Sequence, residues 1–270
     1  MTVTAAGGTD EQFVAAQRAA WASLPMSLTA VAGEGGELVV IDGAADGWLG
    51  RLEGRLRSGV AGVLLARPRP GPPGPEVRRV QQAARDGDVA VVVDRGWAAH
   101  PTVGALAESG RVGQAVLLDC VVTVPVDDRR PSPVLLLEQL AMVRAVLGPV
   151  ATVEFGVGDR SGYSVDGRRG GCIVALSAVR SVGPAHARLT AYASDGEVHV
   201  ELYDDGTAAP ATAWRVDGRG QAGEPTRYES GVRASWLRLV SAVRQDSVTS
   251  DLGALADDLD LLATAGTLEP

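Results

Sequence analysis

The stretch "GVAGVLLARPRP" (residues 59–70) decides the fold of this chain. Its centre, Val63-Leu64-Leu65, is a short apolar run between turn residues, which is typical of a strand buried on both faces. The run ends in Ala66-Arg67-Pro68, so a charged side chain stands where the strand stops. Ligands of α/β sheets bind at the carboxyl ends of the strands. Arg67 is therefore a candidate ligand contact.

Similar apolar runs lie on both sides of this stretch and alternate with helical patterns. Strands are expected at 37–42 and 88–94, and helices at 10–23, 46–59, around Val77, Val80 and Ala83, and from His100 onward. Short apolar strands alternating with helices indicate a parallel sheet covered on both faces. We therefore predict a truncated Rossmann-like α/β layer over residues 1–112.

The pattern changes at Gly113, where a long strand-like run is followed by a helix from Pro133 to Leu147. Several strands then follow in succession, with a hairpin turn at Asp195-Gly196, and two helices close the chain. Residues 113–270 are thus expected to form an α+β domain with an open-faced, mostly antiparallel sheet.

Composition excludes several classes of function. The net charge is −8 and the arginines are scattered among acids, which argues against nucleic acid or an anionic membrane as a partner. No apolar run is long enough to span a membrane, so we expect a cytoplasmic protein, with a composition typical of a GC-rich bacterium. Cys120 and Cys172 are expected to be buried reduced thiols. His100, His186 and His199 lack ligand spacing, so no metal site is expected.

Four segments, in their order and spacing, carry a resemblance to a known family. They are "ELVVIDG" (37–43), "GVAGVLLARP" (59–68), "VVVDRGWAAHPTVGALAESGRVGQA" (91–115) and "LLLEQLAMVRAVLGPVATV" (135–153). Together with the closing helices, they resemble the Gfo/Idh/MocA (glucose–fructose oxidoreductase/inositol dehydrogenase) family over residues 37–265. The resemblance implies a Rossmann domain joined to an open-sheet domain, and hydride transfer between NAD(P) and a sugar or polyol carbon.

The family needs a glycine-rich turn between a strand and a helix to seat the pyrophosphate of its cofactor. The candidate turn "VAGEGGEL" (31–38) is followed by a strand instead of a helix. We therefore expect the GxGxxG unit, the family's first βαβ unit, to be missing or replaced by residues 1–36. The sequence does not decide whether residues 1–36 fill the vacated groove, for which the amphipathic segment around Phe13 and Trp21 is the candidate, and no cofactor is expected.

The family's proton-transfer positions also differ in this chain. Arg67 occupies the place of the lysine in the family's Glu-Lys-Pro, and arginine stays charged at every ordinary pH. Arg67 can still bind a carboxylate or phosphate, or it is a surface arginine. The family's Asp and His fall near Val134 and Glu138. Glu138 is a base in principle, or a surface carboxylate paired with Arg144.

Two further residues follow the third strand. Asp94 stands at its end and either contacts a ligand or caps the next turn, and Trp97 is a candidate ligand contact or a core residue. Asp204-Asp205 is most simply a turn. Arg67 and Glu138 remain candidate catalytic residues, and Arg67, Asp94 and Trp97 candidate ligand contacts.

Three hypotheses follow. In the first, the chain has lost hydride transfer and is an accessory or structural subunit, a homodimer or a heteromer with a full-length relative through its sheet face. In the second, it is a cofactor-independent enzyme or binder of a small metabolite, using the cleft between its domains through Arg67, Asp94 and Glu138. In the third, it is an active sugar or polyol oxidoreductase that binds NAD or NADP in an atypical way.

Overall fold

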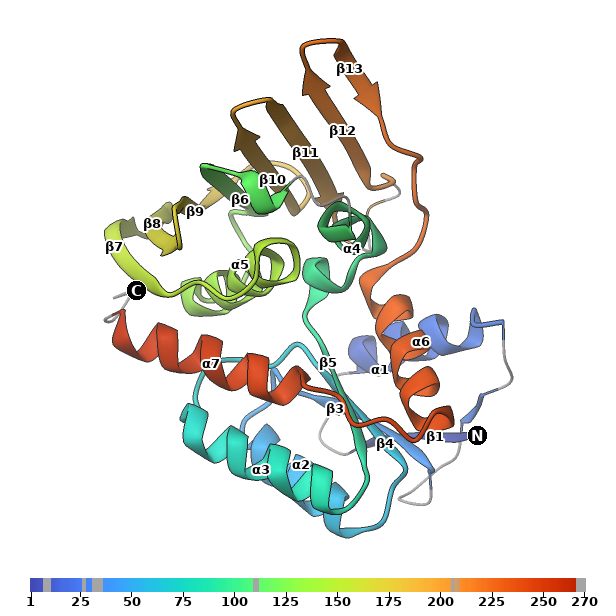
Figure 1. The fold of residues 1–270 in the computed structure, drawn as a ribbon. Helices are drawn as coiled ribbons and strands as arrows, with labels where there is room; N and C mark the ends of the chain where they lie inside the picture. Colours follow the sequence, from blue (N-terminus) through green and yellow to red (C-terminus); the bar gives the residue numbers. More distant parts are fainter. Residues whose placement is uncertain are drawn as a thin grey trace. The chain divides into compact units, whose positions relative to one another are not determined.

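The apolar runs of the first part of the chain form a parallel sheet of five strands in the order β2-β1-β3-β4-β5 in the computed structural model (Figure 1). The strands are β1 (Thr2–Ala6), β2 (Thr29–Ala30), β3 (Leu38–Asp42), β4 (Gly62–Ala66) and β5 (Ala90–Asp94). Every residue of β3, β4 and β5 is buried, because helices cover both faces of the sheet. The predicted parallel layer is confirmed.

The structure describes residues 1–6, 11–25, 28–30, 36–108, 112–204, 207 and 209–265. The chain forms two units, Met1–Gly96 with Gly231–Leu259, and Trp97–Ser230 with Asp260–Pro270. No helix of the described residues is long and apolar enough to cross a membrane.

Helices cover the two faces of the sheet in the first unit. They are α1 (Glu11–Ala22), α2 (Trp48–Arg57), α3 (Gly74–Asp86), α6 (Gly231–Arg244) and the first part of α7 (Asp251–Thr264). Figure 1 shows α2 and α3 on one face, and α1 and α6 on the other. Helix α6 packs on β4 and β5, and its Trp236, Leu239 and Val240 join the core of this sheet. This packing places residues 231–259 in the first unit, whereas the sequence analysis assigned all residues after 112 to the second domain.

Residues 2–30 form a strand–helix–strand unit, so of the two alternatives for the first βαβ unit, missing or replaced by residues 1–36, the first is wrong. Strand β1 is followed in the chain by α1 and then by β2, which pairs with β1 in parallel with Val3 opposite Ala30. On its other side β1 pairs in parallel with β3, from Val3 opposite Leu38 to Ala6 opposite Ile41. Strand β1 was overlooked because "TVTAA" is made mostly of alanine and threonine and lacks the run of valine and leucine found in β3, β4 and β5. Residues 31–35 of the suggested turn at 31–38 lie outside the described part of the chain.

Helix α1 is the helix of this βαβ unit, instead of a segment that fills an empty groove. Phe13 and Trp21 are buried in the core of the sheet. The ring of Trp21 meets the ring of Trp236 edge-on, with the centroids 5.5 Å apart. Trp236 also donates its indole N–H to the side-chain oxygen of Gln17, at 2.8 Å. These contacts fix α1 to α6.

The second unit is built on an eight-stranded sheet in the order β13-β12-β11-β10-β6-β9-β8-β7. Only β6 and β9 pair in parallel among its described strands, so the predicted mostly antiparallel sheet is confirmed. The strands are β6 (Leu117–Pro125), β7 (Thr152–Asp159), β8 (Gly162–Arg169), β9 (Cys172–Ser181), β10 (His186–Ala193), β11 (Gly196–Tyr203), β12 (Thr212–Asp217) and β13 (Gly220–Gly223). Strands β8 and β13 were not predicted, because both are rich in glycine and polar residues.

The inner face of this sheet is covered by α5 (Ser132–Leu147), with α4 (Pro101–Glu108) and the short 3₁₀ turns η1 (Gly96–Ala99) and η2 (Val112–Gln114) nearby in the chain. Gln139 on α5 is fully buried and donates to the carbonyl oxygens of Cys120 and Ser177, at 2.7 and 2.8 Å. Its own side-chain oxygen accepts from Tyr163. One polar residue thus ties the helix to β6, β8 and β9. Both cysteines are free and buried, as predicted.

Candidate functional site

Two loops at the carboxyl edge of the first unit's sheet hold each other in place. The backbone N–H of Gly43, after β3, donates to the oxygen of Ala66 at 2.6 Å, and Arg69 donates back to Gly43 at 3.2 Å. Trp48 adds an indole hydrogen bond to Arg69 O at 3.2 Å. The approach is so close that a Cβ on Gly43 would lie 2.6 Å from the Cα of Pro68. These contacts hold the two loops together, and we call the two loops the platform.

Arg67, which the resemblance aligns with the family lysine, lies in this platform. Its backbone is in the left-handed region with φ of 51°, which is uncommon for a residue other than glycine, and its N–H donates to the oxygen of Asp94 at 3.2 Å. The guanidinium lies 3.1 Å from Asp42 Oδ2, and its Cζ stands 4.6 Å from the ring centroid of Phe13. Its side chain is 48% exposed, so the cation is fixed yet open to solvent.

Asp42 is the residue that sequence reasoning missed at this edge. Its carboxylate is 8% exposed and accepts from Ala44 N–H at 3.0 Å as well as from Arg67. Its backbone oxygen accepts from Arg51 at 3.0 Å, so the turn after β3 is held from both sides. The signal was present, since Asp42 ends the predicted strand 37–42 as Asp94 ends the predicted strand 88–94.

Strands β1 and β3 lie side by side in the sheet. From this pair the sheet continues in opposite directions, to β2 beside β1 and to β4 beside β3, so the strand order reverses between β1 and β3. In open α/β sheets, the crevice at such a switch point is where ligands bind. Asp42 ends β3, and Phe13 lies in the first turn of the helix that follows β1. The residues between β1 and α1 are Gly7-Gly8-Thr9-Asp10 and lie outside the described part of the chain. In sequence, this is a glycine pair between a strand and a helix, without the full GxGxxG spacing.

Asp94 is 1% exposed and ends β5. Its Oδ1 accepts from Gly96 N–H at 3.3 Å and from the hydroxyl of Ser235 on α6 at 3.1 Å. The neighbouring Arg95 forms a buried ion pair with Asp258 at 2.6 Å. Asp94 thus caps the following turn, one of the two roles considered for it.

In the second unit, Trp97 and Glu138 both contact Arg130. The guanidinium carbon of Arg130 stands 5.3 Å from the ring centroid of Trp97, and its Nη1 lies 3.5 Å from Glu138 Oε2. Nη2 of Arg130 also lies 2.8 Å from Asp128 and 3.4 Å from Asp204. We call Arg130, Asp128, Glu138 and Asp204 the Arg130 cluster. It joins the loop after β6 to α5 and to the end of β11.

The acids of the Arg130 cluster differ in their pKa values. Burial alone would raise the pKa of Asp128, but its hydrogen bonds with Arg130 outweigh burial and leave the pKa below the ordinary value. Burial raises the pKa of Asp204, although Arg130 opposes this. Asp204 also borders a pocket of about 210 Å³ whose polar lining includes His100, Tyr203 and Glu229. The cluster therefore offers carboxylates of unequal acidity beside a small polar pocket.

The structure joins the four predicted site residues in pairs. Arg67 and Asp94 share a backbone hydrogen bond in the first unit, and Trp97 and Glu138 share Arg130 in the second. Among the described residues, no group of three His, Cys, Asp or Glu side chains is arranged to hold a metal ion.

No family model and no curated protein matches the sequence. Solved structures do match over 98% of the chain. They include a putative NADPH-dependent oxidoreductase from Desulfitobacterium hafniense (13% identity, 95% of that chain, TM-score 0.76), UDP-N-acetylglucosamine 3-dehydrogenase GnnA from Acidithiobacillus ferrooxidans (14%, 95%, 0.75) and the 3-ketoreductase KijD10 from Actinomadura kijaniata with NADP and TDP-benzene (14%, 96%, 0.72). The chain spans nearly the whole length of these proteins, so the expected truncation is not found. It has the fold of the Gfo/Idh/MocA-type oxidoreductases, a parallel Rossmann-like sheet followed by a mostly antiparallel one.

Proposed function

We propose that the chain binds NAD(H) or NADP(H) at the carboxyl edge of its first unit and acts as an oxidoreductase on a sugar or polyol, with an atypical site. The observation that carries the proposal is the parallel β1–α1–β2 unit, with β3 on the other side of β1 and the cation of Arg67 beside the first turn of α1. A strand and a helix on either side of residues 7–10 support a pyrophosphate seat there, which the sequence alone did not predict. The oxidoreductase fold over both units, and the NADP in the structure of KijD10, support the same function.

The residues at this edge fit an anionic dinucleotide in two respects. A half-exposed guanidinium, held over Phe13, supplies positive charge where the switch-point crevice lies. The glycine pair Gly7-Gly8 in the sequence between strand and helix leaves the backbone free of side chains there. Arg67 would bind a phosphate, and the buried Asp42 would orient Arg67.

The bound nucleotide would supply hydride transfer, and the protein would supply binding and the movement of a proton. Arg67 cannot exchange a proton near neutral pH. By the resemblance, Glu138 on α5 lies near the place of the family histidine, and its Oε2 lies 3.5 Å from Nη1 of Arg130. We propose that Glu138 accepts the proton of the substrate hydroxyl and that Arg130 orients its carboxylate.

The experiment is an absorbance assay of nicotinamide reduction with NAD⁺ and NADP⁺ against aldoses, polyols and nucleotide-linked sugars. The proposal predicts turnover with at least one substrate, and Glu138→Gln is expected to lower kcat by about a hundredfold or more. Glu154→Gln on the edge strand β7, with an exposed side chain, is the matched control. Turnover that Glu138→Gln leaves unchanged would refute the assigned role.

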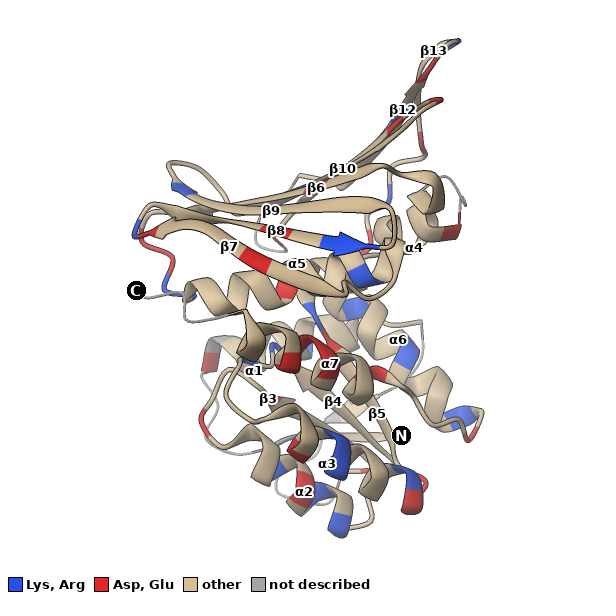
Figure 2. Cartoon of the chain, turned by 60° about the vertical axis from the view of Figure 1, so that its left-hand side comes forward, with Lys and Arg blue, Asp and Glu red and all other residues tan. Residues whose placement is uncertain are grey.

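A second candidate is a non-catalytic subunit, and two observations favour it. The Arg67 cation is already paired with Asp42, and Glu11 places an acid in the first turn of α1, where it would repel a pyrophosphate. The outer face of the eight-stranded sheet is also apolar in part: Tyr192, Leu117 and Ile173 are cross-strand neighbours on β10, β6 and β9. Tyr192 is 36% and Ile173 43% exposed, and Figure 2 shows the strands mostly uncharged.

This candidate predicts that the outer sheet face buries against a second copy or a full-length relative. Light scattering of the purified protein, with Ile173→Glu as the variant, tests the homodimer. A dimer mass that Ile173→Glu converts to a monomer mass would support it. Co-purification with a relative, together with a change in that relative's activity, would support the heteromer. A monomer that co-purifies with no relative would contradict this candidate function.

A further inference from the structure

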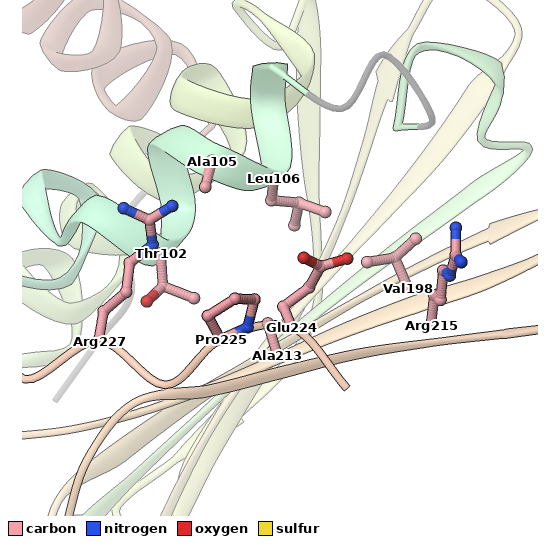
Figure 3. A pocket seen from close by; sticks show the side chains of 9 residues that line it. All are labelled: Thr102, Ala105, Leu106, Val198, Ala213, Arg215, Glu224, Pro225 and Arg227. Atoms are coloured by element: carbon pink, nitrogen blue, oxygen red, sulfur yellow. The ribbon is translucent and has the colours of Figure 1, made fainter. Parts of the chain in front are cut away.

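A small pocket in the second unit lies outside the residues considered so far. Helix α4 forms one wall, the strands β11 and β12 form another, and the segment after β13 closes it (Figure 3). Its volume is about 90 Å³, and it is lined by Thr102, Ala105, Leu106, Val198, Ala213, Arg215, Glu224, Pro225 and Arg227. All of these residues belong to the same unit.

The body of the pocket is apolar. Ala105 and Leu106 come from α4, Val198 and Ala213 from the inner side of the sheet, and Pro225 from the closing segment. These side chains offer a ligand hydrocarbon contact and no hydrogen bonds. The pocket therefore favours an aliphatic body over a sugar ring, whose hydroxyl groups would lose their water without replacement.

One buried hydroxyl provides a polar contact that the protein leaves unused. Thr102 is 5% exposed, and among the described residues nothing hydrogen-bonds to its Oγ1. A buried hydroxyl without a partner is unfavourable, and such groups in native structures often mark a missing ligand or water. Thr102 can donate one hydrogen bond to an acceptor atom in the pocket.

Charge at the pocket favours an anion. The lining has two arginines, Arg215 and Arg227, against one carboxylate, Glu224. Figure 3 draws the guanidinium of Arg227 near Thr102 at one end of the pocket and Arg215 at the other, with the carboxylate of Glu224 between them. An acceptor anion at the Thr102 end would meet both the hydroxyl and the Arg227 cation.

We propose that this pocket binds a short aliphatic monocarboxylate of about four carbons. A volume of about 90 Å³ holds roughly six to nine water-sized atoms, and a four-carbon carboxylate has six heavy atoms. The carboxylate contacts Arg227 and the hydroxyl of Thr102, and the hydrocarbon lies against Leu106 and Ala213. The site does not depend on nucleotide binding, so its test is independent of the test of the proposed function.

The test is an amide NMR titration of the full chain with sodium butyrate at constant ionic strength, in a buffer free of carboxylates. Saturable shifts are expected at Ala105, Leu106 and Ala213. Acetate has less hydrocarbon and butan-1-ol lacks the charge, so each is expected to bind at least several-fold more weakly than butyrate. An absence of saturable shifts at these residues, or equal affinity for butan-1-ol, would overturn the proposal.

Three variants test the assigned contacts. Arg227→Gln is expected to weaken butyrate binding about tenfold, and Thr102→Val several-fold, because each removes a contact to the carboxylate. Glu224→Gln is expected to strengthen it several-fold, because it removes a like charge. Arg219→Gln, at the β12–β13 turn and outside the lining, is the matched control with an unchanged affinity. If Arg227→Gln and Arg219→Gln bind butyrate equally well, the proposal is wrong.

Discussion

The guanidinium of Arg67 lies 3.1 Å from the carboxylate of Asp42, so that the ends of β4 and β3 are joined by an ion pair. Asp42 is almost buried, while the arginine side chain is about half exposed. Such a pair adds less than about 1 kcal/mol to stability, because solvent screens the exposed cation. Its main effect is to fix the direction of the cation at the carboxyl edge of the sheet.

Asp42→Asn separates the two roles of this pair. The asparagine can still accept from Ala44 N–H but no longer neutralises Arg67. The free energy of unfolding is expected to fall by less than about 1 kcal/mol. NADPH affinity is expected to rise several-fold in a calorimetric titration, because Arg67 gains a free charge for the phosphates. An unchanged affinity in a folded variant would show that Arg67 does not contact the nucleotide, whereas a lower one would show that the orientation of Arg67 by Asp42 outweighs its gain in free charge.

Gly43→Ala tests the close approach of the two loops. The added Cβ would lie 2.6 Å from the Cα of Pro68, and this contact with backbone cannot be relieved by a side-chain rotation. We expect a loss of about 1–3 kcal/mol in the free energy of unfolding, measured in urea. Gly104→Ala on α4 is the matched control, since nothing lies within 4 Å of its new Cβ. The control is expected to gain about 0.5–1 kcal/mol from helix propensity.

Gln139→Leu tests the anchor of α5. The change removes both donors to Cys120 O and Ser177 O and leaves the hydroxyl of the buried Tyr163 without its acceptor. We expect a loss of about 2–4 kcal/mol in the free energy of unfolding, because buried polar groups lose their partners. Gln82→Leu, exposed on α3, is expected to change it by less than about 0.5 kcal/mol. Equal losses in the two variants would contradict the anchoring role.

The Arg130 cluster predicts a pH dependence. The pKa of Asp128 is lower in the folded chain than its ordinary value of 3.8. Its charge therefore stabilises the fold above pH 3.8, and this contribution is lost as pH falls through the lower folded pKa. Asp128→Asn is expected to lower the free energy of unfolding by about 1–3 kcal/mol at pH 7. Its difference from the wild type is expected to shrink below pH 3.8.

Urea unfolding of Asp128→Asn at pH 7 and at pH 3 measures this effect. Asp195→Asn in the exposed β10–β11 turn is the control, with little change at either pH. Asp204→Asn is expected to cost less at pH 7 than Asp128→Asn, because burial raises the pKa of Asp204. A cost for Asp128→Asn that is the same at both pH values would exclude the ion pair as its cause.

The sequence predicted the strands that are rich in large apolar residues and failed on those that are not. Strands β3, β4 and β5 were found because full burial makes all their residues apolar or glycine except the closing Asp42 and Asp94. Strand β1 has alanine and threonine, and β8 has glycine and arginine, so their pairing depends on neighbouring strands that no local pattern shows. The missed β1 led directly to the wrong expectation about the first βαβ unit.

The candidate site was predicted in part. The positions of Arg67, Asp94 and Glu138 followed from strand ends and from the resemblance. Their partners Asp42, Ser235 and Arg130 did not, because they lie 25, 141 and 8 residues away in the chain. Contacts of this kind are set by the packing of helices and strands, which composition and periodicity do not encode.

A calorimetric titration of the purified chain with NADH and NADPH tests the central claim most directly. The account predicts saturable micromolar binding of at least one of them, about tenfold weaker in Arg67→Gln. Arg57→Gln on α2, whose side chain is 75% exposed, should bind like the wild type. A folded wild-type protein that binds neither nucleotide would contradict the account and leave the non-catalytic subunit as the better description.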